Sequence, residues 1–156
     1  MKKLTTCILI LIAAAAIAGT AGTTSARASE NGQGIVITFQ KHLVDPVNVI
    51  FQGSTGGAVK GELESQLVPG SLTIVGELWT FSFDWIVTAD APAKSFVAQT
   101  SGTMIGAVAG SPIVMDGVVT SGWHQGAAMH MQGQLVDPTT FTIAGTITIQ
   151  PGNSGS

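Results

Sequence analysis

Apolar and polar side chains alternate with a period of two along most of the chain after residue 28. In residues 78–89 apolar side chains form one face of a strand, and the other face is mostly polar, with Thr80, Ser82, Asp84 and Thr88. Residues 139–149 show the same alternation, with isoleucines opposite threonines. This period is typical of β-strands with one buried face, and no helical apolar stripe is present. The pattern predicts nine strands, at residues 35–44, 47–54, 57–67, 71–76, 78–89, 94–104, 112–121, 126–136 and 139–149.

A short motif repeats along the chain. Leu-Val-Asp-Pro occurs at 43–46 and at 135–138, each time followed by apolar residues three and five positions after the proline and by a glycine after seven. Leu-Val-Pro at 67–69 is followed by the same residue types at the same distances from the proline, namely Leu72, Ile74 and Gly76. Asp-Pro and Pro-Gly favour tight turns. We therefore expect a repeated strand–turn–strand unit whose apolar residues at odd offsets face the core.

Glycines recur at the centre of predicted strands, between apolar residues two positions away on either side. Glycine in a strand interior is unfavourable unless the backbone bends or lies close to another group. Small barrels need such bends in order to close, and closure also removes exposed strand edges. The sequence thus predicts an all-β fold, an antiparallel meander of about eight strands that closes into a small barrel. A two-sheet sandwich is the alternative.

The first 28 residues have the three parts of a secretory signal. Lys2 and Lys3 precede an apolar run at 7–18, and Ala26-Arg27-Ala28 provides a cleavage site. A membrane-spanning helix needs about 20 apolar residues, more than this run offers. We therefore expect a cleavable signal peptide at 1–28 and an exported protein, periplasmic or secreted. Residues 29–156 would form a single all-β domain with short disordered ends at about 29–33 and 151–156.

Cleavage after Ala28 would change the charge and the thiol content. Cys7 would leave with the signal peptide, so the mature chain would hold no disulfide or thiolate metal site. Three lysines, Lys41, Lys60 and Lys94, would remain against nine acidic residues, which gives a net charge of −6. Too few cations remain to neutralise a nucleic-acid backbone or to bind anionic lipid through a basic patch. We expect no nucleic-acid partner, and membrane contact only through the signal peptide.

No catalytic or metal-binding motif is evident. The three histidines, His42, His124 and His130, are scattered and lack the third ligand that metal sites usually have, so we expect neither a metal nor another cofactor. Asp84 lies within the most aromatic strand, where a carboxylate facing an apolar interior would become a general acid or base. The alternation of the strand places Asp84 on the face opposite the aromatic side chains. Whether a carboxylate faces the interior is also open for Asp116. Asp84 and His130 are the weak catalytic candidates.

The aromatic face of residues 78–89 has two interpretations. Its members are Trp79, Phe81, Phe83 and Trp85. Large aromatic side chains at alternate positions usually belong to the core of a sheet. The second interpretation is that they line a site for a small apolar ligand.

Three segments carry a resemblance to known proteins. Phe83–Val87, Ser95-Phe96 with Thr100–Thr103, and Gly122–Asp137 are similar to a family of uncharacterised exported bacterial β-barrel proteins. The resemblance covers most of the mature chain and implies no activity. Members tend to have acids after the position of His130, where this chain has Met131 and Gln132. More loosely, the meander resembles allene oxide cyclase-type and dirigent-type barrels, which implies an apolar substrate guided mainly by shape.

Three functions follow as hypotheses. The first is a non-catalytic exported barrel that binds a small apolar ligand or a surface component. The second is a shape-directed cyclase or isomerase with Asp84 or His130 as its acid or base. The third is a structural surface protein that self-associates as a homo-oligomer, which the apolar residues on both faces of 113–119 favour. An outer-membrane barrel is a weaker alternative, because the chain lacks tyrosine for aromatic girdles.

We predict that the exported protein begins at Ser29, because the Ala26-x-Ala28 site follows an apolar segment of signal-peptide length. Intact mass spectrometry of secreted material measures this directly. Secreted protein that retained residues 1–28 would contradict the prediction.

Overall fold

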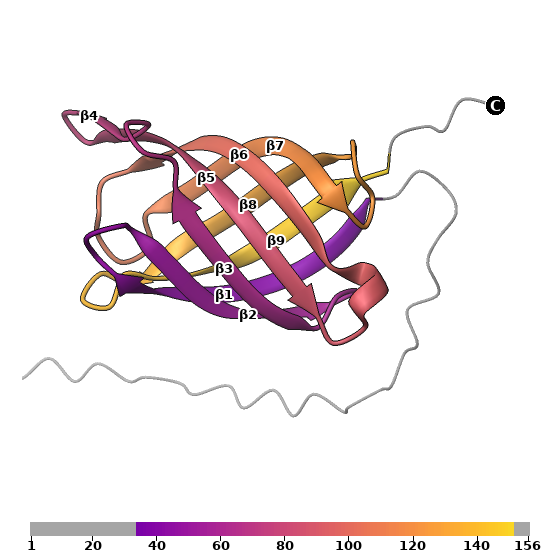
Figure 1. Ribbon diagram of the computed structural model, residues 1–156. Helices are drawn as coiled ribbons and strands as arrows, with labels where there is room; N and C mark the ends of the chain where they lie inside the picture. The colour runs from indigo at the N-terminus through magenta and orange to yellow at the C-terminus, as the bar shows by residue number, and fades with distance from the viewer. Residues whose placement is uncertain (1–33, 152–156) are drawn as a thin grey trace, which may run out of the picture.

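The computed structural model describes residues 34–151, which form nine β-strands and one 3-10 helix around a common interior (Figure 1). The elements are β1 Ile35–Asp45, β2 Ile50–Gly57, β3 Gly61–Leu67, β4 Thr73–Val75, β5 Leu78–Ala89, η1 Pro92–Lys94, β6 Phe96–Ile105, β7 Pro112–Gly122, β8 Ala128–Asp137 and β9 Thr142–Gln150. No helix in this part of the chain is long and apolar enough to cross a membrane. The expected signal peptide, its cleavage site and, apart from Pro151, the expected disordered ends lie outside the described residues.

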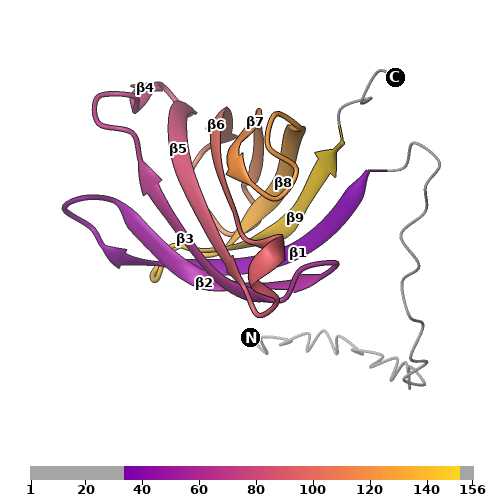
Figure 2. The ribbon, with the colours of Figure 1, turned by 45° about the vertical axis from the view of Figure 1, so that its right-hand side comes forward.

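Antiparallel pairing joins the strands in the order β3-β2-β1-β9-β8-β7-β6-β5-β4. A further pairing of β3 with β5, from Gly61 opposite Ala89 to Leu67 opposite Phe83, connects the two ends of this order. Eight strands therefore form a closed antiparallel barrel, and β4 is an additional strand paired with one end of β5. In Figure 2 the β4 hairpin projects beyond the barrel. The predicted all-β barrel is confirmed, and the sandwich alternative is wrong.

All nine predicted strands are present, with bounds that differ from the prediction by at most four residues. The larger differences fall at turns, around residues 46–49, 58–60 and 138–141. Each turn contains more residues than the alternation indicates, because the apolar pattern continues into it. Period two identifies a strand but does not show where its hydrogen bonding ends.

The two Leu-Val-Asp-Pro segments form matching hairpin turns. The Asp45 carboxylate accepts hydrogen bonds from the Asn48 side chain at 2.7 Å and from the Val47 and Asn48 backbone amides. Asp137 accepts from the Thr139 amide at 2.8 Å and from the Thr140 hydroxyl at 2.9 Å. These hydrogen bonds favour the ionised carboxylates and lower the pKa of both aspartates.

The same turns share two further features. The strand register shifts one residue before each aspartate, between Leu43 and Asp45 and again between Leu135 and Asp137. Val49 and Phe141, three residues after each proline, both have φ of 51°. This left-handed conformation is unfavourable for bulky side chains and persists only where the surroundings impose it. Both side chains pack against the core, so packing holds the turns in this shape.

The third repeat unit behaves differently, which corrects one expectation. Leu72 is 40% exposed and Ile74 is 50% exposed, so neither residue is buried in the core. Gly70 has φ of 77°, and the Ser71 amide bonds back to the Val68 carbonyl in the turn. β4 then pairs only with residues 78–80 of β5, beyond the end of β3. Both residues stay partly exposed because β4 extends past the barrel wall and pairs with the end of β5 alone among the described strands.

Strand glycines allow neighbouring strands to approach closely. A Cβ atom on Gly145 would lie 2.1 Å from the Gln132 carbonyl oxygen and 2.5 Å from the Gly133 Cα atom. Gly53, Gly61, Gly102 and Gly117 are similar, with carbonyl oxygens of adjacent strands 1.9–2.2 Å from the same position. Any side chain there would overlap backbone. These glycines therefore set how tightly the sheet can coil.

The interior is a single apolar core to which every strand except β4 contributes. The largest fully buried apolar side chains are Trp85, Ile37, Met115, Met129, Met131, Leu135, Ile147 and Ile149. They come from alternate positions of their strands, as the period predicts. The aromatic face of β5 points inward, with Phe81, Phe83 and Trp85 all buried.

We predict that Gly145→Val destabilises the barrel by about 1–3 kcal/mol, the usual cost of overpacking. The valine side chain must displace the backbone of β8, and its higher strand propensity, worth at most about 1 kcal/mol, does not offset this. Thr146→Val is the matched control, because it adds valine to the next, outward-facing position. We expect the control to be neutral or slightly stabilising. Urea unfolding of both variants measures the difference, and equal stabilities would contradict the prediction.

Candidate functional site

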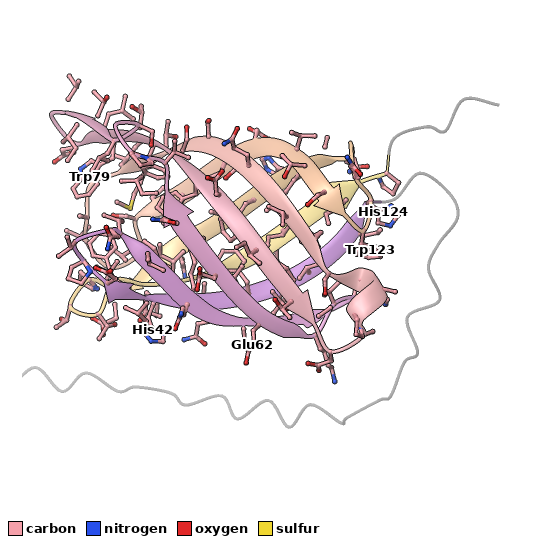
Figure 3. The ribbon with its side chains drawn as sticks, in the orientation of Figure 1. His42, Glu62, Trp79, Trp123 and His124 are labelled. Carbon is pink, nitrogen blue, oxygen red and sulfur yellow. The ribbon has the colours of Figure 1, made fainter. Side chains whose placement is uncertain are left out.

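The two ends of the barrel differ. Turns 46–49, 68–72, 106–111 and 138–141 surround one end together with the β4 hairpin, and we call it the β4 end. Trp79 lies there, whereas Trp123 and His124 lie at the opposite end (Figure 3). Trp123 packs against the core, with the Lys94 amine 5.7 Å from its ring centre. A functional opening is therefore expected at the β4 end.

A cavity of about 70 Å³ lies inside the β4 end. It holds several water molecules or a short apolar group and is much smaller than pockets for drug-sized ligands, which measure about 300–1,000 Å³. Phe81 and Phe83 of β5 line it, together with Met104 of β6, Met115 of β7 and Met131 of β8. Val49 and Phe141, from the two strained turns, contribute to the lining together with Leu72 and Trp79.

Among residues 34–151, Lys41 of β1 is the only ionisable residue that lines this cavity. Its side chain is 2% exposed and follows Ile37 and Phe39 on the inward face of the strand. Across the sheet it pairs with Gly53 of β2 and Ile143 of β9. Because Gly53 has no side chain, the β2 backbone lies against the backbone of Lys41 at this point. The position is thus built into the barrel wall and not into a flexible loop.

Aromatic rings and one hydroxyl surround the Lys41 amine. Its Nζ atom donates a hydrogen bond to Ser65 Oγ of β3 at 2.7 Å. The same atom lies 3.8 Å from the ring centre of Trp85 and 4.8 Å from those of Phe51 and Phe83. These rings are held in turn, since Phe51 packs edge-on against Phe83. The amine is therefore fixed in position by neighbours that are themselves packed.

The Trp85 ring below the amine has its own anchors. Its indole Nε1 donates to Thr100 Oγ1 at 2.8 Å, and Phe39 packs edge-on at 5.7 Å between ring centres. Thr100 is itself buried. A buried indole usually satisfies its N–H in this manner. Trp85 is thus held firmly against the Lys41 amine.

Burial lowers the pKa of the Lys41 amine well below its ordinary value. Removal from water disfavours the ammonium form. The three aromatic rings and Ser65 attract the charged form and offset part of this effect. No acidic side chain is buried among residues 34–151, so no carboxylate compensates the charge inside the barrel. The amine consequently has a larger neutral fraction than an exposed lysine.

The predicted ligand-lining residues are mostly at the cavity. Trp79, Phe81 and Phe83 line it, whereas Trp85 lies one strand position deeper, below the Lys41 amine. Their role in binding a ligand stays a prediction. The four follow one another along β5 from the mouth of the barrel to its centre.

The two predicted catalytic candidates lie on the outer face of the barrel. Asp84 is exposed and accepts a hydrogen bond from Gln99 Nε2 at 2.9 Å. His130 Nδ1 lies 2.5 Å from Asp116 Oδ1, across the β7–β8 pair. Neither residue lines the cavity, so neither can act on a molecule bound there.

The remaining histidines are apart from one another and from the cavity. His124 packs against the Trp123 ring at the far end, and His42 points outward from β1 (Figure 3). Within residues 34–151 no three histidine, cysteine or acidic side chains are grouped closely enough to hold a metal ion. Two wider hollows, of about 460 and 430 Å³, lie on the outer face along Glu64. Exposed polar side chains form much of their lining, so they lack the enclosure of the cavity.

Lys41 was not among the residues predicted for the site, because in the sequence it counts only as one of three remaining charges. The signal was present in the alternation of the strand. Lys41 occupies the same series of alternate positions as the apolar residues Ile35, Ile37, Phe39 and Leu43. A lysine within an inward-facing apolar series is unusual, since lysine is rarely fully buried without a partner. Ser65 occupies the corresponding inward position of β3, between outward-facing Glu64 and Gln66.

Comparison of the chain with protein-family models, with curated proteins and with solved structures finds no match. The resemblances drawn from the sequence stay predictions. Function must therefore be argued from the cavity and from Lys41.

We predict that the barrel gains stability relative to Lys41→Met as the pH rises. The folded-state pKa of Lys41 is lowered, so between that pKa and about 10.4 the unfolded chain binds more protons than the barrel. In this window the free energy of unfolding rises by up to about 1.4 kcal/mol per pH unit in the wild type. The variant lacks this contribution.

Urea unfolding at several pH values from about 6 to about 10 measures both slopes. Lys60→Met is the control, because it removes an exposed lysine from the same barrel. A wild-type slope equal to that of Lys41→Met would show that the amine titrates alike in the folded and unfolded chain.

Proposed function

We propose that this barrel binds a small apolar molecule, or the apolar end of a larger one, in the cavity at its β4 end. The observation that carries the proposal is the cavity itself, which is enclosed by apolar side chains from almost every strand of the barrel. Its volume of about 70 Å³ suits a short chain or small ring. A longer ligand would extend past Leu72 and Trp79 into solvent.

The composition of the lining supports this proposal. Met104, Met115 and Met131 are flexible side chains that adapt to differently shaped apolar groups. The aromatic rings of β5 provide packed walls beside them, since Phe81 and Phe83 lie edge-on to each other and Trp79 pairs directly with Met104. Apolar surface also continues outside the mouth, where Ile74 and Val75 of the β4 hairpin are exposed. Such a patch beside a cavity is typical of a binding site.

The proposal includes export. With cleavage after Ala28, the barrel would meet its ligand in the periplasm or outside the cell. The looser likeness to allene oxide cyclase-type and dirigent-type barrels belongs to the same proposal, since an apolar molecule enclosed by strands is what those barrels hold. A cyclase activity here would have to use Lys41, the one ionisable side chain that the described part of the chain brings to the cavity.

Self-association is less well supported. Val114 and Val118 on the outer face of β7 are 40% and 41% exposed. Their cross-strand neighbours on β6 are Thr103 and Gln99, so polar side chains interrupt the apolar surface on that side. Scattered apolar residues of this kind are normal on a soluble surface.

We predict that hexanol, an uncharged apolar probe, shifts the methyl NMR signals of the three cavity methionines, Met104, Met115 and Met131. Met129 is an internal control, because it is equally buried but does not line the cavity. Titration of methyl-labelled protein gives both the affinity and the location. Equal shifts at all four methionines, or none, would contradict binding in the cavity.

A pair of variants tests the entrance. Leu72 lines the cavity and Leu78 does not, although the two are exposed to a similar degree on neighbouring segments. We expect Leu72→Trp to weaken hexanol binding several-fold by obstructing the mouth, and Leu78→Trp to leave it unchanged. The opposite order would place the entrance elsewhere.

A further inference from the structure

We propose that Lys41 forms an imine with the carbonyl group of an apolar aldehyde or ketone bound in the cavity. The inference rests on the proposed function and specifies the chemical class of the ligand. Three observations lead to it: the amine is buried, it lies at the inner end of the cavity, and no acidic partner is buried with it.

The shape of the cavity sets the direction from which a ligand approaches the amine. Along β5 the cavity lining runs from Trp79 at the mouth to Phe83, and Trp85 is the next inward residue. The Lys41 Nζ atom lies above Trp85 and between Phe51 and Phe83, which line the cavity. A ligand that enters at the mouth with its polar group first therefore meets the amine at the end of its path.

The nucleophile in this reaction is the neutral form of the Lys41 amine. Only a neutral amine has a lone pair that can attack a carbonyl carbon, and desolvated lysines in apolar pockets are activated in this way. Ser65, Phe51, Phe83 and Trp85 are the inward-facing groups around the amine, and none is acidic. The nearby ionisable groups face outward at alternate positions: His42 of β1, Glu62 and Glu64 of β3, and Asp84 of β5.

The reaction balances without another reactant. The nitrogen lone pair attacks the carbonyl carbon, the C=O π electrons move to oxygen, and one amine proton transfers to that oxygen to give a carbinolamine. The C–O bond then breaks, the C=N bond forms, and the second amine proton leaves with the hydroxyl as water. One carbonyl compound and one neutral amine thus give one imine and one water molecule.

The hydrogen-bond donors at the cavity distinguish a carbonyl ligand from a carboxylate ligand. A carboxylate has about four acceptor sites to satisfy, and its burial is costly without several donors. Beyond Lys41, the only side-chain donor in the lining formed by residues 34–151 is the indole N–H of Trp79, which lies at the mouth. An aldehyde crosses the apolar lining without burying a charge. The donor set therefore favours the carbonyl.

The test uses the mature barrel with hexanal, followed by borohydride, which reduces an imine to a stable secondary amine. Intact mass and peptide mapping then identify the modified residue. Lys60 and Lys94 are exposed and act as internal controls, because modification that followed exposure would reach them first. We expect Lys41 to be labelled first, with each unit of pKa lowering giving on the order of tenfold more neutral amine.

Lys41→Met should lose this selective label, whereas Lys60→Met, which removes an exposed lysine outside the cavity, should keep it. If hexanol binds but hexanal labels only Lys60 and Lys94, the imine is refuted and apolar binding stands. If neither compound binds in the cavity, both proposals fail. Non-covalent binding of hexanoate that depends on Lys41, without labelling by hexanal, would identify a carboxylate site and overturn the inference.

Discussion

Pairing of β3 with β5 is the constraint on which the rest of this structure depends. It turns a sheet of strands into a closed wall, so that every inward side chain faces an enclosed interior. A small closed barrel must coil tightly, and the strand glycines allow this by letting carbonyl groups of adjacent strands approach the positions where side chains would be. The cavity exists because this coiled wall is closed along its sides and accessible at one end. Closure also explains why Lys41 is buried, since no edge remains through which its amine could reach water.

The buried amine has an energetic consequence for the barrel. Desolvation of an amine is unfavourable, and the barrel compensates it with one hydroxyl and three aromatic rings instead of a carboxylate. An apolar residue of similar length would fill the same space without that penalty. Stability alone therefore does not explain a lysine at this position. Functional sites are where proteins depart from the side chains that packing favours.

Much of the fold could be predicted from the sequence because its signals are local. The alternation in β5 identifies both the strand and its inward face, and the Leu-Val-Asp-Pro repeats locate two hairpins. Leu72 and Ile74 follow the same pattern, yet they are exposed, because burial depends on whether a strand lies opposite and the sequence does not encode this locally. The glycine positions indicated a bent sheet but not which carbonyl groups approach them.

The candidate site was harder to predict. The aromatic residues of β5 that line the cavity could be recognised as an alternating series. The ionisable group of the site, however, is a single lysine, Lys41, on a different strand. Its neighbours Ser65 and Trp85 are distant in sequence and meet it only after the barrel closes. Asp84 and His130 attracted attention because their residue types are common in catalysis, although the alternation in β5 already placed Asp84 opposite the aromatic face.

The register between the first and last strands has a consequence for biosynthesis. β1 pairs with β9, from Ile35 opposite Ile149 to Lys41 opposite Ile143, and nearly the whole barrel sequence lies between them. Because a chain is made from its N-terminus, β1 emerges early while its second neighbour is still untranslated. Until β9 is available, one edge of β1 has unpaired backbone groups, and the interior that will enclose Lys41 is open to water. Full enclosure of the lysine therefore requires the last strand, because β9 pairs with β1 at Lys41 itself.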